Sequence, residues 1–324
     1  MALRTKSLRG IAWGAKFDHC SRLGIPSVAA LAVLAMASFA GAQQPREKLR
    51  EPVFRVEKRQ PQTVAQQQPA QQQPAQQVQP STQPANGGQG SPAEHPLMPA
   101  IRMAQNSLLA IDKNVKDYSC TMVKREAVGS ALGDHEYIFL KVRHQPFSVY
   151  MYFLGPESIK GRECIYVHGQ NNNKLVAHEG GRGGALLPTV SLDPTSKLAM
   201  RNQRYPITEI GLRNLTTKLI EVAQADSRFG ECDVRFFKDA KVNGRLCTGL
   251  HVMHPVRRDN FRFHAAQVFI DNELQIPIRY ASYDWPARAG EQPPLIEEYT
   301  YTNLKINNGF TDADFDRNNK QYGF

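Results

Sequence analysis

A stripe of apolar residues at helical spacing opens the part of the chain that we expect to fold. Its six members follow one another at alternating steps of four and three, and Pro99 falls in the first turn, where a helix tolerates proline. They are Leu97, Ile101, Ala104, Leu108, Ile111 and Val115. A second apolar stripe, which includes Leu215 and Leu219, predicts a helix over residues 208–225 with Thr208 as its N-cap.

The remaining apolar segments alternate with period two, which is typical of β-strands. Their connections are short and rich in turn residues, such as Asn243-Gly244, and contain no helix, so neighbouring strands should be antiparallel. The expected strands are 118–126, 136–143, 147–154, 163–168, 174–178, 234–242, 245–253, 261–271, 276–284 and 295–306. The pattern predicts a mainly β, α+β fold: one large, strongly curved antiparallel sheet with two helices packed on it.

Two of these strands, 136–143 and 147–154, are apolar on both faces. Val149, Met151 and Phe153 lie on one face of their strand, while Tyr150 and Tyr152 lie on the other. Such strands must be covered on both sides, and two helices shield only part of one face of so wide a sheet. The rest is either ordinary core or the wall of an apolar cavity. The candidate wall consists of Ile138, Leu140, Val142, Val149, Met151 and Phe153, with Arg143 near its rim.

The N-terminal pattern is that of a secretory signal. Basic residues precede an apolar run over 28–39, which ends in Ala40-Gly41-Ala42. The alternative is an uncleaved anchor, but Pro26 and Gly41 interrupt the longer run over 25–42, and it is poorly suited to span about 30 Å of hydrocarbon. We therefore expect a signal peptide over 1–42, cleavage after Ala42, and export to the periplasm or cell envelope.

Residues 43–94 read as a linker without a fold of its own. The motif Gln66-Gln-Gln-Pro-Ala70 repeats at once as Gln71-Gln-Gln-Pro-Ala75. A segment of this composition has too little apolar surface to form a core. The folded domain is expected over residues 95–324.

Charge and cysteine content narrow the function classes. Residues 1–42 carry a net charge of +4 and residues 43–94 one of +2, which leaves +4 of the total +10 on the domain. That balance does not indicate nucleic-acid binding, although it is compatible with peripheral contact to an anionic membrane. The domain has four cysteines, Cys120, Cys164, Cys232 and Cys247, whose pairing is open. Cys232–Cys247 is the nearest pair in sequence and is slightly favoured as a bridge. The register of an Asn243-Gly244 hairpin argues against this bridge, because it would place Cys247 opposite Ala240. Cys120 reads equally as a buried free thiol.

The sequence lacks recognisable catalytic or metal-binding motifs. The glycine-rich stretch 180–184 lacks the lysine and hydroxyl residue of a phosphate loop, and the histidines do not converge. Glu297 and Glu298 are neighbours in a strand and therefore point to opposite faces, unlike a facing acid–base pair. We expect no catalytic residue, no metal and no cofactor.

Several motifs resemble those of known families. The segment Lys141-Val-Arg-His-Gln-Pro146-Phe147, and the ending from Tyr299 to Phe315, are similar to the LolA/LolB-like superfamily of periplasmic lipoprotein carriers. More specifically, the chain over 97–324 resembles a secreted bacterial family known as domain of unknown function 1571. The motifs are Asp117-Tyr-Ser-Cys120, Pro146-Phe-Ser-Val-Tyr150, Gly161-Arg-Glu163, Asp271-Asn-Glu273 with Pro277-Ile-Arg279, and Tyr283-Asp-Trp-Pro286.

The resemblance implies a half-barrel around a hydrophobic cavity, with the helices as a lid. In the carriers such a cavity shelters the acyl chains of a lipoprotein, and the nearest counterpart of their critical arginine is Arg143. Our first hypothesis is an exported, non-enzymatic protein that binds lipid or lipoprotein acyl chains. The second is a ligand-free module of the same fold that docks another envelope protein, and the third is a hydrolase.

Overall fold

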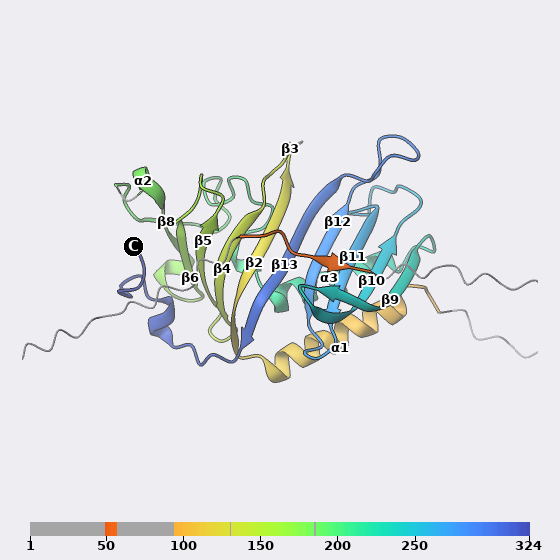
Figure 1. The fold of residues 1–324 in the computed structure, drawn as a ribbon, viewed down its shortest axis with the longest axis horizontal. Coiled ribbons are helices and arrows are strands. Elements are labelled where there is room, and N and C mark those ends of the chain that lie inside the picture. The colour runs from red at the N-terminus through yellow and green to blue at the C-terminus, as the bar shows by residue number, and fades with distance from the viewer. Residues whose placement is uncertain (1–48, 57–93, 130, 185) are drawn as a thin grey trace, which may run out of the picture. The chain divides into compact units, whose positions relative to one another are not determined.

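The protein's structure, a computed structural model, describes residues 49–56, 94–129, 131–184 and 186–324 (Figure 1). The expected signal peptide and most of the expected linker lie outside these residues. The described chain forms an open antiparallel sheet of 13 strands with two long helices. The expected fold class is therefore confirmed.

The sheet consists of two meanders joined in the middle. The strands follow one another in the order β1-β9-β10-β11-β12-β13-β2-β4-β5-β6-β7-β8, and β3 pairs only with β2. The first long strand, β2, thus lies beside the last, β13. The strands are β1 (Phe54–Arg55), β2 (Asp117–Val128), β3 (Ala131–Leu132), β4 (Glu136–Arg143), β5 (Ser148–Gly155), β6 (Glu163–Val167), β7 (Leu175–His178), β8 (Val190–Leu192), β9 (Asp233–Val242), β10 (Arg245–Met253), β11 (Ala265–Asp271), β12 (Pro277–Tyr283) and β13 (Leu295–Ile306).

All ten predicted strands are present, and most of their ends agree to within one or two residues. The largest difference is β11, which begins at Ala265 instead of residue 261. The Asn243-Gly244 turn joins β9 to β10 and places Cys247 opposite Ala240, as its spacing predicts. The short strands β1, β3 and β8 are not among the predicted strands.

Two long helices cover one face of the sheet, which we call the inner face. They are α1 (Met98–Asn114) and α3 (Leu212–Asp226), and they pack against each other. The helix α2 (Gly181–Gly184) and the 3-10 turns η1 (Asn171–Asn173), η2 (Ile207–Glu209) and η3 (Asp312–Phe315) are short. The predicted first helix is confirmed, with Pro99 near its start.

The predicted start of the second helix is wrong. The helix begins at Leu212, its N-cap is Gly211 and not Thr208, and residues 207–209 form the separate turn η2. Gly211 has φ 106° and ψ 164°, a region open essentially to glycine alone. The Leu212 N–H, which has no acceptor within the helix, donates to the Tyr118 hydroxyl at 3.0 Å. A contact with a distant strand therefore sets the start of α3.

We expect Gly211→Ala to lower the free energy of unfolding by about 1–3 kcal/mol. A Cβ at this position would lie 2.9 Å from the Tyr118 hydroxyl oxygen and would strain the backbone. Urea denaturation measures the change. Gly230→Ala is the matched control, because a Cβ there meets nothing within 4 Å. Equal losses in the two variants would contradict this account of the helix start.

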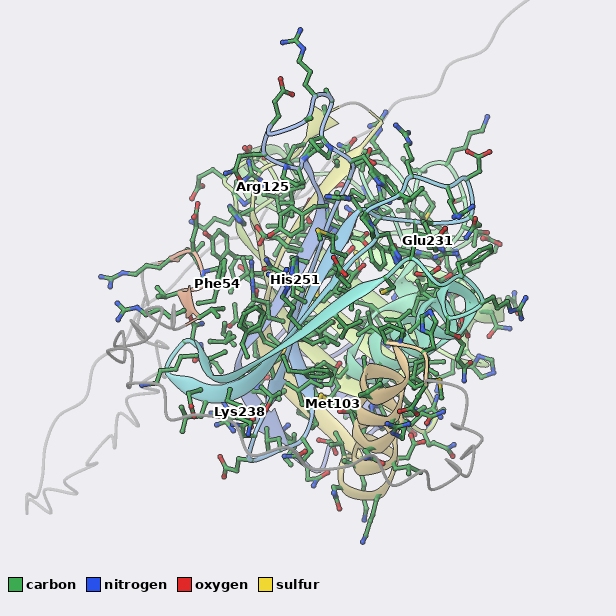
Figure 2. The ribbon with its side chains drawn as sticks, turned by 90° about the vertical axis from the view of Figure 1, so that its right-hand side faces the viewer. Phe54, Met103, Arg125, Glu231, Lys238 and His251 are labelled. Carbon is green, nitrogen blue, oxygen red and sulfur yellow. The ribbon has the colours of Figure 1, made fainter. Side chains whose placement is uncertain are left out.

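Residues 49–56, which we expected to belong to the unfolded linker, contact the sheet instead. Strand β1 extends the sheet at β9, with Phe54 opposite Val242, and Val53 and Asn243 exchange two hydrogen bonds of 2.8 Å. The Phe54 ring lies 4.1 Å from the Arg279 guanidinium on the outer face, which is the face opposite the helices. Figure 2 shows Phe54 on the other side of the sheet from Met103 of α1. The linker assignment is therefore wrong at these residues.

The four cysteines of the domain are free thiols, so the favoured Cys232–Cys247 bridge is not formed. Cys247 faces Ala240 across the hairpin, and Cys232 precedes β9 and packs against the inner-face core. Cys120 is a buried thiol, which was the alternative expectation. Burial raises the pKa of Cys232 to about 12, so this thiol is protonated and unreactive at neutral pH.

Candidate functional site: an apolar cavity with one polar end

A cavity of about 1100 Å³ lies between the inner face of the sheet and the helices α1 and α3. Pockets for drug-sized ligands span roughly 300–1,000 Å³, so this cavity has room for a larger molecule. Strands from both meanders and both long helices contribute to its wall. Its apolar lining includes Leu97, Met122, Phe153, Leu219, Val252 and Val268.

The period-two pattern of the strands explains this lining. Val268 and Ile270 of β11 point to the inner face and line the cavity, whereas Phe269 between them packs against Ala240 and Val242 on the outer face. The helices cannot fill the space because their facing side chains are partly small, as at Ala100 and Ala104. A cavity therefore remains between the wide sheet and the helices where the helix side chains are small.

The residues predicted as the cavity wall divide into two groups. Met151 and Phe153 of β5 line the cavity. Ile138, Leu140, Val142 and Val149 lie on the same inner face, but they belong to a close-packed core and are at most 1% exposed. The end of α1, through Ile111 and Val115, and Leu212 of α3 cover them. Two of the six predicted residues thus border the cavity and the other four form close-packed core. Contact of any of them with a ligand stays a prediction.

Arg143 does not lie at the cavity. Its side chain points to the outer face, where its guanidinium forms an ion pair with Asp312 at 2.8 Å and donates to the Ser148 hydroxyl at 3.0 Å. The same group lies 5.0 Å from the ring of Phe315. Because strand residues alternate, Arg143 lies on the face opposite to Val142, and the structure places it away from the cavity instead of near its rim.

One end of the cavity is lined by a polar cluster that the sequence analysis missed. It consists of Lys124, Glu126, Glu136, Glu297 and Tyr299, all of which line the cavity. Glu126 of β2 and Glu297 of β13 are directly opposite each other, although like charges in that position repel. They are only 8% and 4% exposed. Such a pair needs hydrogen-bond donors close by.

Tyr299 and Lys124 supply some of these donors. The Tyr299 hydroxyl donates to Glu126 Oε1 at 2.5 Å and lies 3.5 Å from Glu297 Oε2. Lys124 Nζ lies 3.2 Å from both Glu126 Oε2 and Glu136 Oε2. The Tyr299 hydroxyl thus joins Glu126 to Glu297, and the Lys124 ammonium group joins Glu126 to Glu136.

The other donors come from residues 198–210, the covering segment, which lines this end of the cavity. The Arg204 Nε–H donates to Glu297 Oε2 at 2.8 Å, and the backbone N–H of Arg204 donates to Glu126 Oε2 at 3.1 Å. The Tyr205 hydroxyl donates to Glu297 Oε1 at 3.1 Å. The cluster therefore holds the covering segment against the sheet, because Glu126 and Glu297 accept hydrogen bonds from Arg204 and Tyr205.

Burial controls the ionisation of this cluster. Burial raises the pKa of Glu297 above its usual range, although the Arg204 guanidinium and the Tyr205 hydroxyl oppose the shift. Burial, followed by the charge of Glu297, raises the pKa of Tyr205 to about 12. Burial likewise raises the pKa of Tyr299, so the hydroxyls of Tyr205 and Tyr299 are both donors at neutral pH. The raised pKa of Glu297 makes its carboxyl group easier to protonate than a carboxyl group in water.

We expect the covering segment to loosen as the pH rises through the raised pKa of Glu297. With the segment closed, Glu297 is buried and binds its proton more tightly than it would in an open state reached by water. Protonation therefore favours the closed state, and ionisation favours opening. Hydrogen exchange followed by mass spectrometry should show protection factors over 201–206 that fall with rising pH.

Glu297→Gln should remove this pH dependence, whereas exposed Glu291→Gln should retain it. The protection factors must be corrected for the intrinsic effect of pH on exchange. A slope that is unchanged in Glu297→Gln would show that another group controls the segment.

Only Glu297 of the Glu126–Glu297 pair was considered as a candidate from the sequence. The strand pattern predicts that Glu297 and Glu298 point to opposite faces, which is confirmed, since Glu298 binds Arg279 on the outer face at 2.7 Å. The partner of Glu297 is 171 positions earlier in the chain and is found only once β13 is known to pair with β2. The available signal was the polar alternation of Lys124 and Glu126 at the end of an apolar strand.

The described residues contain no group of three or more His, Cys, Asp or Glu side chains that could hold a metal ion. Among the same residues, no helix is both long and apolar enough to cross a bilayer.

Comparisons with solved structures give similar folds at low identity. A LolA superfamily protein from Nitrosomonas europaea is 11% identical, with 66% of this chain and 97% of that chain covered and a TM-score of 0.28. The Mycobacterium tuberculosis lipoprotein LppX is 14% identical, with 65% and 98% covered and a TM-score of 0.37. In the Pseudomonas aeruginosa MucA/MucB complex the matched chain is 14% identical, with 67% and 60% covered and a TM-score of 0.39.

No curated protein sequence is significantly similar to this chain. A family model does match, over residues 115–324, which is well over half of the chain. The model is described as "Protein of unknown function (DUF1571)", and the match confirms the resemblance that the sequence motifs indicated. The chain therefore belongs to the DUF1571 family.

Proposed function

We propose that this protein is an exported, non-enzymatic carrier that holds the acyl chains of a lipid or lipoprotein in its cavity. The observation that carries the proposal is the hollow itself: about 1100 Å³ lined on most sides by aliphatic side chains. A hollow of this size leaves its lining without packing partners, which costs stability unless a ligand fills it. An elongated apolar ligand fits that surface best.

The expected affinity follows from the apolar surface that an acyl chain buries. About a dozen methylenes contribute ~10 kcal/mol at ~0.8 kcal/mol each, and association costs at least ~4 kcal/mol. The remaining ~6 kcal/mol corresponds to a dissociation constant of tens of micromolar for a single chain. A ligand with two chains should bind far more tightly and remain bound during purification.

The supporting experiment is a titration of delipidated protein with a fluorescent fatty acid. The proposal predicts saturable binding in the micromolar range, competed by an unlabelled lipid with two acyl chains. A probe that shows no saturable binding would refute it.

One observation favours the alternative, a module that docks another envelope protein. Residues 49–56 show that the β9 edge and the outer face accept an extended segment, through strand pairing at Phe54 and the Phe54–Arg279 contact. That alternative does not need the cavity. It becomes the better account if the fatty-acid titration fails while the protein captures a defined envelope partner.

A further inference from the structure

The surface where the cavity opens is unusually apolar. Four side chains of residues 186–201, the rim segment, are exposed: Leu186 is 88% exposed, Leu187 53%, Val190 38% and Leu198 57%. Leu187, Val190 and Leu198 also line the cavity, so they mark its mouth. Apolar surface thus continues without a break from the interior to the outside. Exposed apolar patches of this kind mark sites of contact with proteins or membranes.

The charges around the rim segment favour an anionic partner. Lys197 and Arg201 are exposed, and the only acidic residue of the segment is Asp193. The Asp193 carboxylate accepts hydrogen bonds from the backbone N–H and the hydroxyl of Thr195, at 2.8 and 2.6 Å. These bonds lower the pKa of Asp193, as does the nearby charge of Lys174. The cations are therefore Lys174, Lys197 and Arg201, and the carboxylate of the one acid, Asp193, is already hydrogen-bonded to Thr195.

The position of the rim segment suits an approach to a flat surface. It includes β8, the last strand of the sheet, which lies at the opposite end from β9 (Figure 1). The helices α1 and α3 pack on the inner face and leave the segment uncovered. Leucines that project almost fully into solvent, flanked by cations, match a lipid bilayer with an anionic surface, because such a surface accepts apolar side chains without a shaped pocket.

We propose that the rim segment docks the protein on an anionic lipid bilayer, with Leu186, Leu187 and Leu198 inserted between the lipids. The inference rests on the proposed acyl-chain function and extends it. Docking brings the cavity mouth into contact with the bilayer, so an acyl chain passes between membrane and cavity without crossing water. The cations Lys174, Lys197 and Arg201 bind the lipid headgroups, which makes docking dependent on ionic strength.

The test is flotation of the mature chain with vesicles. Vesicles of equal parts phosphatidylglycerol and phosphatidylcholine are compared with vesicles of phosphatidylcholine alone. We expect binding to the anionic vesicles, weaker binding in high salt, and a partition coefficient about tenfold lower for Leu186→Ser, because the inserted side chain loses its apolar contact. Lys197→Gln should weaken binding to anionic vesicles only.

Leu246→Ser is the matched control, since Leu246 is 51% exposed and lies on β10, in the other half of the sheet. Leu186 does not line the cavity, so Leu186→Ser should take up the fluorescent fatty acid in solution as the wild type does. Absence of wild-type flotation, or an equal loss in Leu246→Ser, would overturn the docking proposal. Flotation without uptake of the fatty acid would instead refute the carrier function and leave docking supported.

Discussion

Ala266→Trp is expected to weaken acyl-chain binding by roughly 200-fold. Ala266 lies on β11, is 3% exposed and lines the cavity. A tryptophan there would occupy the volume of about four methylenes, and the loss of their burial corresponds to ~3 kcal/mol at ~0.8 kcal/mol each. Titration with the fluorescent fatty acid measures the change.

The cavity has room for the added ring, so the variant should stay folded and melt within a few degrees of the wild type. Leu246→Trp adds an aromatic side chain at an exposed position away from the cavity and should bind the probe normally. Unchanged affinity in a folded Ala266→Trp protein would mean that the ligand binds somewhere else.

Leu140→Ala is expected to cost about 2–5 kcal/mol of unfolding free energy. Leu140 is fully buried in the close-packed core below the cavity, where the truncated side chain leaves a void. Met151, directly opposite on β5, borders the existing hollow and has fewer packing partners to lose. Met151→Ala should therefore cost less stability, as urea denaturation of both variants would show.

The same two variants separate core from cavity wall by affinity. Leu140→Ala should bind the fatty acid as the wild type does once corrected for the folded fraction, whereas Met151→Ala should bind several-fold more weakly. A larger loss of affinity in Leu140→Ala would place the ligand where the sequence pattern alone located the wall.

The strands could be predicted from the sequence because the period-two alternation and the turn residues are set by neighbouring positions in the chain. The alternation around Met151 and the Asn243-Gly244 turn place strands and register without reference to the rest of the fold. The start of α3 could not be predicted in this way, because it depends on a hydrogen bond to Tyr118, 94 positions earlier. The short strand β1 was missed since Phe54 stands in a polar, charged stretch and pairs only through its contact with β9.

The site was predictable only in part for a related reason. Val149 and Met151 are two positions apart and lie on the same face of one strand. Val149 nevertheless belongs to the packed core, whereas Met151 borders the cavity. The difference depends on how far the ends of α1 and α3 extend over the sheet, which the strand sequence does not encode. The Glu126–Glu297 pair likewise requires the closing contact between β2 and β13.

Native mass spectrometry of the protein purified from its own envelope tests the central claim most directly. The account predicts a population heavier than the polypeptide by the mass of an acylated ligand, and a return to the polypeptide mass after delipidation. A spectrum that contains the unliganded polypeptide alone, from protein never exposed to detergent or solvent, would contradict it.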